Sequence, residues 1–168
     1  MSQAASAADK QAIDTLHTAY LSALDQGDMA GWAAIFAMAP DTSYFCISAE
    51  NDRRGFPLAL MYDDCRGRID DRVSFVTKVW AGTFQPYRMR HFIQRLSMEA
   101  AGTNQYRVTS GFTIMMTPEG GATTILTSGE YRDLIAIEGE GDKSRAVFRE
   151  RRAVYDADVL PRYIVFPF

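Results

Sequence analysis

The stretch QYRVTSGFTIMMT, residues 105–117, decides the fold class of this chain. Side chains alternate between the two faces of a β-strand, so its apolar positions share one face, which we expect to be buried. These positions are Tyr106, Val108, Phe112, Ile114 and Met116. A strand of about a dozen residues is about twice the usual length. Such length predicts a strongly twisted, curved sheet.

Three further segments rich in β-branched and aromatic residues accompany this strand, at 87–100, 122–137 and 144–156. The turn-forming clusters GTN, PEGG and EGEGD separate them, which predicts an antiparallel meander. A long curved sheet wrapped on helices makes a cone. The fold class expected from these patterns is therefore α+β.

The helices of this cone are predicted mainly at the front of the chain. Between residues 7 and 27 the apolar residues recur every three or four positions, with His17 beside the stripe, and Gly27 can serve as a left-handed cap. A short second helix is expected from the N-cap residue Asp28 to Pro40. Residues 1–6 are small and polar, so we expect a frayed end.

The middle of the chain mixes short elements. We predict strands at 43–48 and 58–62, with a turn or loop at 51–57 between them. Asp64 is the expected N-cap of a helix that reaches about Val79. This helix would bury Ile69, Val73, Val76 and Trp80 and turn Arg66, Arg68, Asp70, Asp71 and Lys78 outward. The apolar ending VLPRYIVFPF should pack on the sheet or on a partner.

Size and composition favour one globular domain, 1–168. A chain of 168 residues can bury about 70% of its unfolded surface around one core. The net charge of -3, without a block of basic residues, argues against nucleic-acid binding. We see no signal peptide and no apolar run long enough for a membrane helix, so the expected location is the cytoplasm. Cys46 and Cys65 are expected to be buried, reduced thiols.

Metal and nucleotide sites find little support in the sequence. Its two histidines and two cysteines would all be consumed by one Rieske cluster, yet no C-x-H or C-x-x-H motif occurs. A mononuclear iron triad would need both histidines from remote elements. Neither G-x-G-x-x-G nor G-x-x-x-x-G-K is present, and no serine lies in an elbow motif. We therefore expect no cofactor in this chain.

The densest charge lies between Tyr62 and His91, and it allows two interpretations. In one, a pocket enclosed by the cone uses a histidine or an aspartate with a shifted pKa for acid–base chemistry. The candidates are His91 paired with Asp64, Asp70 or Asp71, or one of Asp63, Asp64, Asp70 and Asp71 by itself. In the other, the charges form a solvated or partner-facing surface, as runs of charge usually do.

Charge also persists along the predicted strands, and this favours the second interpretation. Arginines with aromatic neighbours are typical of protein interfaces. We expect these charged residues on strand faces that a monomer would leave to water: Arg90, Arg95, Arg107, Glu130, Arg132, Arg149, Glu150, Arg151 and Arg152.

Several motifs in a fixed order resemble the small, or β, subunit of aromatic-ring-hydroxylating dioxygenases. The motifs are L-D-x-G-D with W-x-x-x-F (24–36), D-R-V (71–73), R-x-R-H (88–91) and E-R-R-A-V-Y-D (150–156), followed by an apolar C-terminus. The resemblance covers nearly the whole chain. It implies a cone-shaped fold of the nuclear-transport-factor-2-like kind, in agreement with the patterns above.

The resemblance also implies a function. In that family the β subunit carries no cofactor, and the partner α subunit holds the [2Fe-2S] Rieske cluster and Fe(II). The β subunits meet about a threefold axis in an α3β3 hexamer, fed with electrons from NADH. By position, the implied subunit contacts are Arg66, Arg68, Asp70, Asp71, Arg72, Trp80, Arg88, Arg90 and His91.

Three functions therefore stay open. The leading one is a non-catalytic structural subunit of such an oxygenase, with an aromatic carboxylate as the weakly favoured holoenzyme substrate. The second is a stand-alone isomerase or dehydratase of the same fold, since this fold also hosts such enzymes. The third is a ligand-binding module without chemistry.

Overall fold

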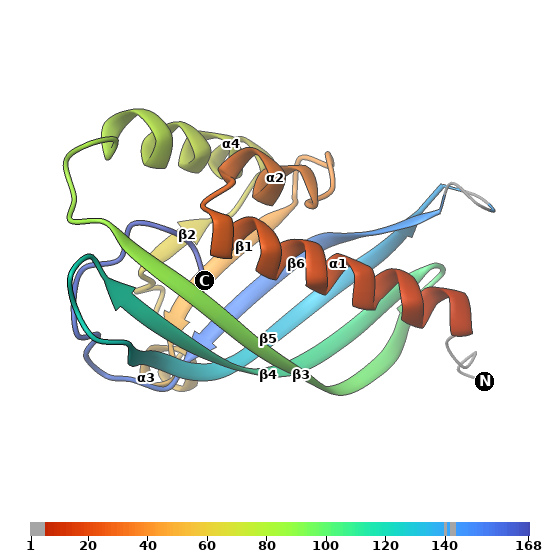
Figure 1. Cartoon of the computed structure of the whole chain (residues 1–168). Coiled ribbons are helices and arrows are strands. Elements are labelled where there is room, and N and C mark those ends of the chain that lie inside the picture. The colour runs from red at the N-terminus through yellow and green to blue at the C-terminus, as the bar shows by residue number, and fades with distance from the viewer. Residues whose placement is uncertain (1–5, 140, 142–143) are drawn as a thin grey trace.

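A strongly curved, six-stranded sheet dominates the computed structural model, which describes residues 6–139, 141 and 144–168 (Figure 1). Its strands are β1 (Ser43–Ser48), β2 (Met61–Asp63), β3 (Tyr87–Gly102), β4 (Gln105–Pro118), β5 (Thr124–Glu138) and β6 (Arg145–Tyr155). The strand order is β2-β1-β6-β5-β4-β3. The predicted antiparallel meander is confirmed in β3 to β6, whereas β1 joins the sheet parallel to β6.

Breaks in register bend the long strands. The pairing shifts between Arg95 and Ser97 on β3, between Ile114 and Met115 on β4, and between Leu134 and Ile135 on β5. An irregularity of this kind bends a strand and increases its twist. The sheet therefore curls into an open cone with one concave and one convex face, as the strand lengths predict.

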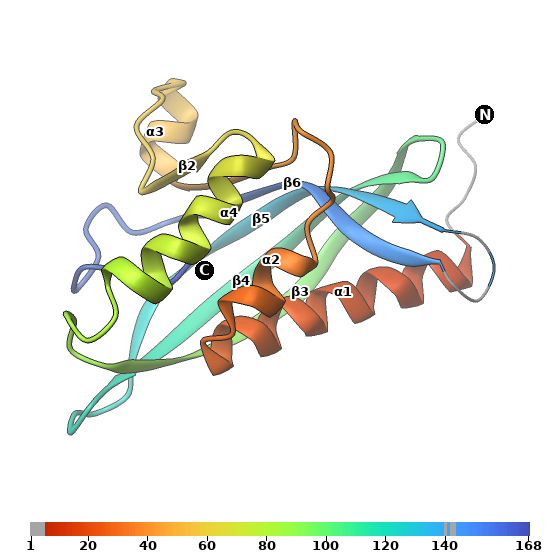
Figure 2. The same cartoon turned by 90° about the horizontal axis from the view of Figure 1, so that it is seen from above.

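Helices lie on both sides of this sheet: α1 (Ala7–Gln26), α2 (Met29–Ala34), α3 (Ala49–Arg54) and α4 (Arg66–Ser74), which continues as the π-helical turn η1 (Phe75–Val79). The long helix α1 crosses the concave face, and α3 lies on the opposite side of the sheet (Figures 1 and 2). Caps fix the ends of α1: the Ser6 hydroxyl accepts a hydrogen bond from the Asp9 amide, and Gly27 adopts the left-handed conformation. Among the described helices, none is long and apolar enough to cross a membrane.

The core fills the space between α1 and the concave face. The five alternating residues of β4 are all buried, as predicted, and Ile13, Leu16 and Tyr20 of α1 pack in the same cluster. The apolar C-terminal segment packs there too. Its last residue, Phe168, is held at both backbone groups by Tyr44, whose hydroxyl donates to the carbonyl at 2.7 Å and accepts from the amide at 3.0 Å.

Several predictions for the middle of the chain are wrong. The expected loop at 51–57 is largely the helix α3, because Ser48 caps its start and Gly55 closes its end. The strand expected at 58–62 is only the three-residue β2. Helix α4 begins at Arg66 with Cys65 at the N-cap position, while Asp64 pairs instead with Arg68.

The structure also tests the predictions for the N-terminus and for the two cysteines. Fraying was expected for residues 1–6, but Ser6 is an ordered cap, and residues 1–5 lie outside the described part. A buried, free thiol is confirmed for Cys46, where burial raises the pKa well above its usual value. Cys65 is also free but only half-buried, because it lies at the exposed start of α4.

Candidate functional site

Much of the predicted charge cluster between Tyr62 and His91 is used inside the chain. Asp63 of β2 is buried, and its two carboxylate oxygens accept hydrogen bonds from Nε and Nη2 of Arg72. Burial alone would lower the pKa of Arg72, but the hydrogen bond and charge of Asp63 outweigh it and raise that pKa. The pair thus fastens α4 to the sheet edge. This geometry does not offer Asp63 as a free acid or base.

Arg66 was expected to face outward, and this is wrong. Its side chain is only 12% exposed. Its Nη1 donates to the backbone carbonyls of Ala33 at 2.9 Å and Phe36 at 3.1 Å, and its Nη2 pairs with Asp70 at 2.7 Å. One of these carbonyls lies in the last turn of α2 and the other two residues after its end, so the guanidinium binds the chain where α2 stops. Arg66 therefore joins α4 to α2.

Other members of the cluster do remain on the surface. Arg68, Asp70 and Asp71 are exposed on α4, and Arg88 and Arg90 are exposed on β3. Trp80 is half-buried and stacks on Tyr163 of the C-terminal segment. These side chains are available to a partner.

His91 does not meet any of the aspartates proposed for it. Its side chain is 0% exposed and its Nδ1 lies 2.7 Å from Oδ1 of Asp25, at the end of α1. The backbone amide of His91 donates to the same oxygen at 3.2 Å. The pair ties the edge strand β3 to α1. The predicted proximity to Asp64, Asp70 or Asp71 is wrong because strand alternation turns His91 to the concave face.

The second histidine belongs to a buried polar cluster that the sequence interpretation missed. Arg151 was expected on a solvent-facing strand surface, yet it is 0% exposed and points into the core. Its Nη1 lies 3.3 Å from Oδ2 of Asp133, directly across the β5–β6 ladder, and Nε2 of His17 lies 3.4 Å from the same oxygen. The guanidinium lies over the rings of Tyr20 and Tyr131, 3.8 and 3.7 Å from their centroids.

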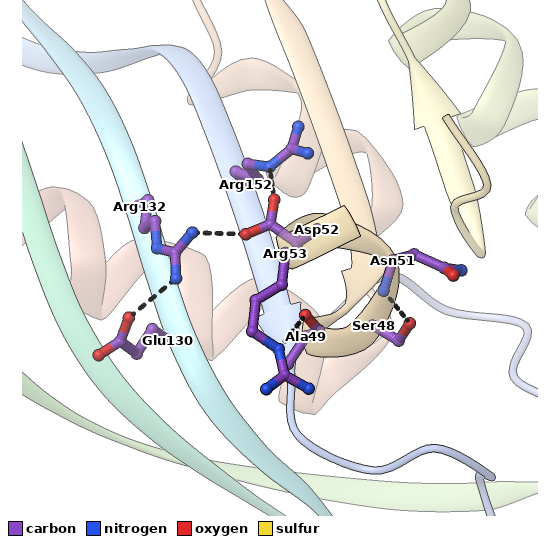
Figure 3. A network of polar contacts seen from close by, with 8 residues as sticks. All are labelled: Ser48, Ala49, Asn51, Asp52, Arg53, Glu130, Arg132 and Arg152. Atoms are coloured by element: carbon purple, nitrogen blue, oxygen red, sulfur yellow. Dashed lines mark hydrogen bonds and ion pairs between the residues drawn. The ribbon is translucent and has the colours of Figure 1, made fainter. Parts of the chain in front are cut away.

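On the convex face an ion-pair network holds the short helix α3 (Figure 3). Asp52 accepts hydrogen bonds from Arg132 of β5 at 2.6 Å and Arg152 of β6 at 2.8 Å, and Arg132 also pairs with Glu130. Burial alone would raise the pKa of Asp52, but the hydrogen bonds and charges of Arg152 and Arg132 outweigh it and lower that pKa. The network defines where α3 lies on the sheet.

Replacement of Asp52 by asparagine tests this network. A carboxyl whose pKa is lower in the folded than in the unfolded chain stabilises the fold above its unfolded pKa, near 4, and loses that contribution as the pH falls through the folded pKa. We expect Asp52→Asn to lower the melting temperature at pH 7 and to cost progressively less as the pH falls below about 4. Thermal unfolding followed by circular dichroism across this range checks it. The exposed Asp158→Asn serves as control, and a pH-independent difference would contradict the assignment.

The convex face also carries an exposed apolar surface beside this network. We call it the outer-face patch: Arg88, Phe92, Leu96, Met115 and Ile125, on β3, β4 and β5, of which Met115 is half-buried and the others are exposed. Phe92, Leu96 and Ile125 are 58%, 56% and 65% exposed. Strand alternation explains the patch, since Tyr87, Met89 and His91 point inward and Arg88, Arg90 and Phe92 outward. Exposed aromatic and aliphatic side chains next to arginine are typical of a protein-binding surface.

The comparison with protein families agrees with this geometry. The family model described as ring hydroxylating beta subunit matches residues 20–162, from the middle of α1 to the C-terminal segment. The chain belongs to the ring hydroxylating beta subunit family. The match includes β1 to β6 and every residue of the outer-face patch. Comparison with curated proteins gives no match.

Solved structures of beta subunits have the same fold. A chain assigned as the beta subunit of an aromatic-ring-hydroxylating dioxygenase from Novosphingobium aromaticivorans DSM 12444 is 26% identical, with a TM-score of 0.79 over 94% of this chain and 95% of that chain. The beta subunit of the benzoate 1,2-dioxygenase from Burkholderia mallei ATCC 23344 is 17% identical, with a TM-score of 0.71 over 96% and 99%.

A third structure shows that the fold reaches beyond beta subunits. A protein assigned as a scytalone dehydratase from Novosphingobium aromaticivorans is 16% identical, with a TM-score of 0.63 over 93% of this chain and 91% of that chain. At this identity the likeness concerns the fold alone. The predicted nuclear-transport-factor-2-like α+β fold is thereby confirmed.

The histidines and cysteines of this beta subunit, which could ligate a metal, lie on different elements of the fold. The histidines and cysteines fall on α1, β3, β1 and the residue before α4. Within the described residues, no group of three or more His, Cys, Asp or Glu could hold a metal ion. A Rieske cluster needs two cysteines and two histidines around one pair of irons, so these side chains do not fit it.

Proposed function

We propose that this beta subunit is a non-catalytic structural component of an aromatic-ring-hydroxylating oxygenase, and that it stabilises an α subunit. The α subunit would carry the Rieske cluster and Fe(II). The family match over residues 20–162 carries the proposal. On this proposal both redox centres lie in the partner. We propose an α3β3 assembly in the cytoplasm, with β subunits around a threefold axis.

The outer-face patch supports a role in assembly. It is a convex surface that α1, α2 and α4 leave uncovered, because these helices lie on the concave side or over the β2 end of the sheet (Figures 1 and 2). Obligate interfaces bury on the order of 2,000 Å² or more and have apolar centres. Phe92 and Ile125 would form such a centre, with Arg88 and Arg90 at its rim.

The candidate contact residues divide into two groups on this proposal. Six of them have exposed or half-exposed side chains that could contact a neighbouring subunit directly: Arg68, Asp70, Asp71, Trp80, Arg88 and Arg90. The side chains of Arg66, Arg72 and His91 are engaged within the chain. We propose that these three act on assembly by holding α4 and β3 in place.

The buried histidines argue for this function over the acid–base alternative. A general base must come within hydrogen-bond reach of its substrate. The side chains of His17 and His91 are 6% and 0% exposed, and each lies against an aspartate. A substrate would reach neither without a rearrangement of α1 against the sheet.

We expect a gene for a chain with Rieske Cys and His spacing beside this gene, and co-expression of the two chains tests the function. We expect the two chains to purify together in equal amounts, with a native mass for three copies of each. The complex should show the visible absorption of a Rieske cluster, and the isolated beta subunit should show none. An isolated chain that converts a small substrate by itself, or that fails to bind the α subunit, would contradict the proposal.

Substitutions in the outer-face patch test the surface itself. We expect Phe92→Ser or Ile125→Ser to weaken association by about tenfold or more, since a buried interface aromatic or aliphatic anchor contributes roughly 2 kcal/mol. The matched control is Val159→Ser, a strongly exposed apolar residue outside the sheet. Sedimentation of the purified complexes over a dilution series measures the effect. Equal dissociation of all variants would exclude this face as the interface.

A further inference from the structure

The interior of the cone holds more polar atoms than its own hydrogen bonds satisfy. We call the residues His17, Tyr20, Tyr131, Asp133 and Arg151 the inner polar cluster. The unpartnered buried atoms among them are Nε2 of His17, both tyrosine hydroxyls, Oδ1 of Asp133, and Nε and Nη2 of Arg151. Such a concentration in one core is unusual, because buried polar groups are nearly always hydrogen-bonded.

Contacts within the cluster do not satisfy these atoms, although the Tyr20 hydroxyl also faces Trp32 and Tyr44 outside it. The contact between Arg151 and Asp133 at 3.3 Å uses one guanidinium nitrogen and one carboxylate oxygen. The rings of Tyr20 and Tyr131 attract the positive charge of Arg151 but are weak hydrogen-bond acceptors. The remaining N–H groups of Arg151 and the free oxygen of Asp133 therefore still need partners.

The mixture of donors and acceptors indicates which kind of molecule the inner polar cluster would bind. Arg151 offers only donors, Asp133 offers an acceptor, and the tyrosine hydroxyls can do both. Burial raises the pKa of Tyr20 to about 12 and that of Tyr131 well above its usual value, so both hydroxyls keep their protons near neutral pH. A bound anion would satisfy Arg151 but would be repelled by Asp133. A small neutral molecule that donates and accepts suits all of them.

We propose that the inner polar cluster is an internal hydration site, at which ordered water molecules bridge Arg151 and Asp133 to the hydroxyls of Tyr20 and Tyr131. Buried water typically makes about three hydrogen bonds to polar groups that would otherwise lack partners. The cluster supplies donors and acceptors from β5, β6 and α1. Water would thus join the long helix to the centre of the sheet. The proposal concerns the folded subunit and does not depend on its assembly.

A crystal structure of the full chain at high resolution is the direct test. We expect at least one water within hydrogen-bond distance of Oδ1 of Asp133 or of Nε or Nη2 of Arg151. A dry core, in which these atoms have turned to protein partners, would overturn the proposal. So would a planar oxyanion bound to Arg151.

Oxygen-17 relaxation dispersion of water gives a second measurement in solution, since it counts long-lived internal waters. Tyr131→Phe removes one hydroxyl from the cluster with little change in shape, and the count should fall by at least one. The control is Tyr106→Phe, whose hydroxyl already donates to Asp9 at 2.6 Å near the surface. A wild-type chain without long-lived waters would overturn the proposal, as would equal counts in wild type and Tyr131→Phe.

Discussion

Replacement of Arg151 by methionine is expected to destabilise the subunit strongly. The substitution keeps much of the apolar stem but leaves the buried carboxylate of Asp133 without its cation. Removing one partner of a buried ion pair costs about 3–5 kcal/mol. For a chain of this size that corresponds to a fall of roughly 10 °C in melting temperature. Differential scanning calorimetry at neutral pH measures it.

Two further variants separate the buried charge from other effects. Arg149→Met lies two residues away on β6 and removes a surface pair with Asp41, so it should cost under about 1 kcal/mol. The double variant Arg151→Met with Asp133→Leu removes both buried charges and should recover much of the loss. If Arg151→Met and Arg149→Met were equally stable, the buried pair would have no special role.

Gly129→Ala is expected to be at least as damaging, for a steric reason. A Cβ atom at Gly129 would lie 2.1 Å from the carbonyl oxygen of Val154 and 2.9 Å from both Tyr155 Cα and Phe112 Cζ. Two of these are backbone atoms of the paired strand, which cannot move aside alone. Overpacking typically costs about 1–3 kcal/mol, and backbone clashes exceed this range. We expect little soluble, folded protein, as judged by expression yield and circular dichroism.

Gly111→Ala is the matched control on the neighbouring strand β4. A Cβ atom there meets only Leu96 Cδ1 at 3.9 Å, an ordinary contact. Alanine should therefore leave stability unchanged or raise it slightly, because it restricts the unfolded chain. If Gly129→Ala and Gly111→Ala changed stability equally, the loss of glycine's backbone freedom, and not the steric clash, would determine the outcome.

The fold could be predicted from the sequence because its signals are local and repeated. Alternation in residues 105–117 and turn clusters between the long strands predict the curved meander without knowledge of any contact. The short elements were harder to predict. Helix α3 depends on the Ser48 cap and the Gly55 end within a segment that also has the composition of a loop.

The site was less predictable because exposure is a property of the whole fold. Arg151 was predicted in a surface series of arginines, but Ala153, two residues on, is fully buried, and alternation from it places Arg151 on the inner face. That signal was present in the sequence. The pairing of His91 with Asp25 was not, because it depends on how α1 crosses the sheet.

The parallel pairing of β1 with β6 has a consequence for the time at which the fold can form. On the ribosome, Ser43 emerges long before its partner Glu150, and the other strand that pairs with β1 in the described structure is β2, on its opposite edge. Until then the aromatic residues Trp32, Phe36 and Tyr44 lack the surface that buries them. Distant pairings form slowly, and exposed apolar segments aggregate meanwhile. The core around these three rings can therefore close only after β6 has left the exit tunnel.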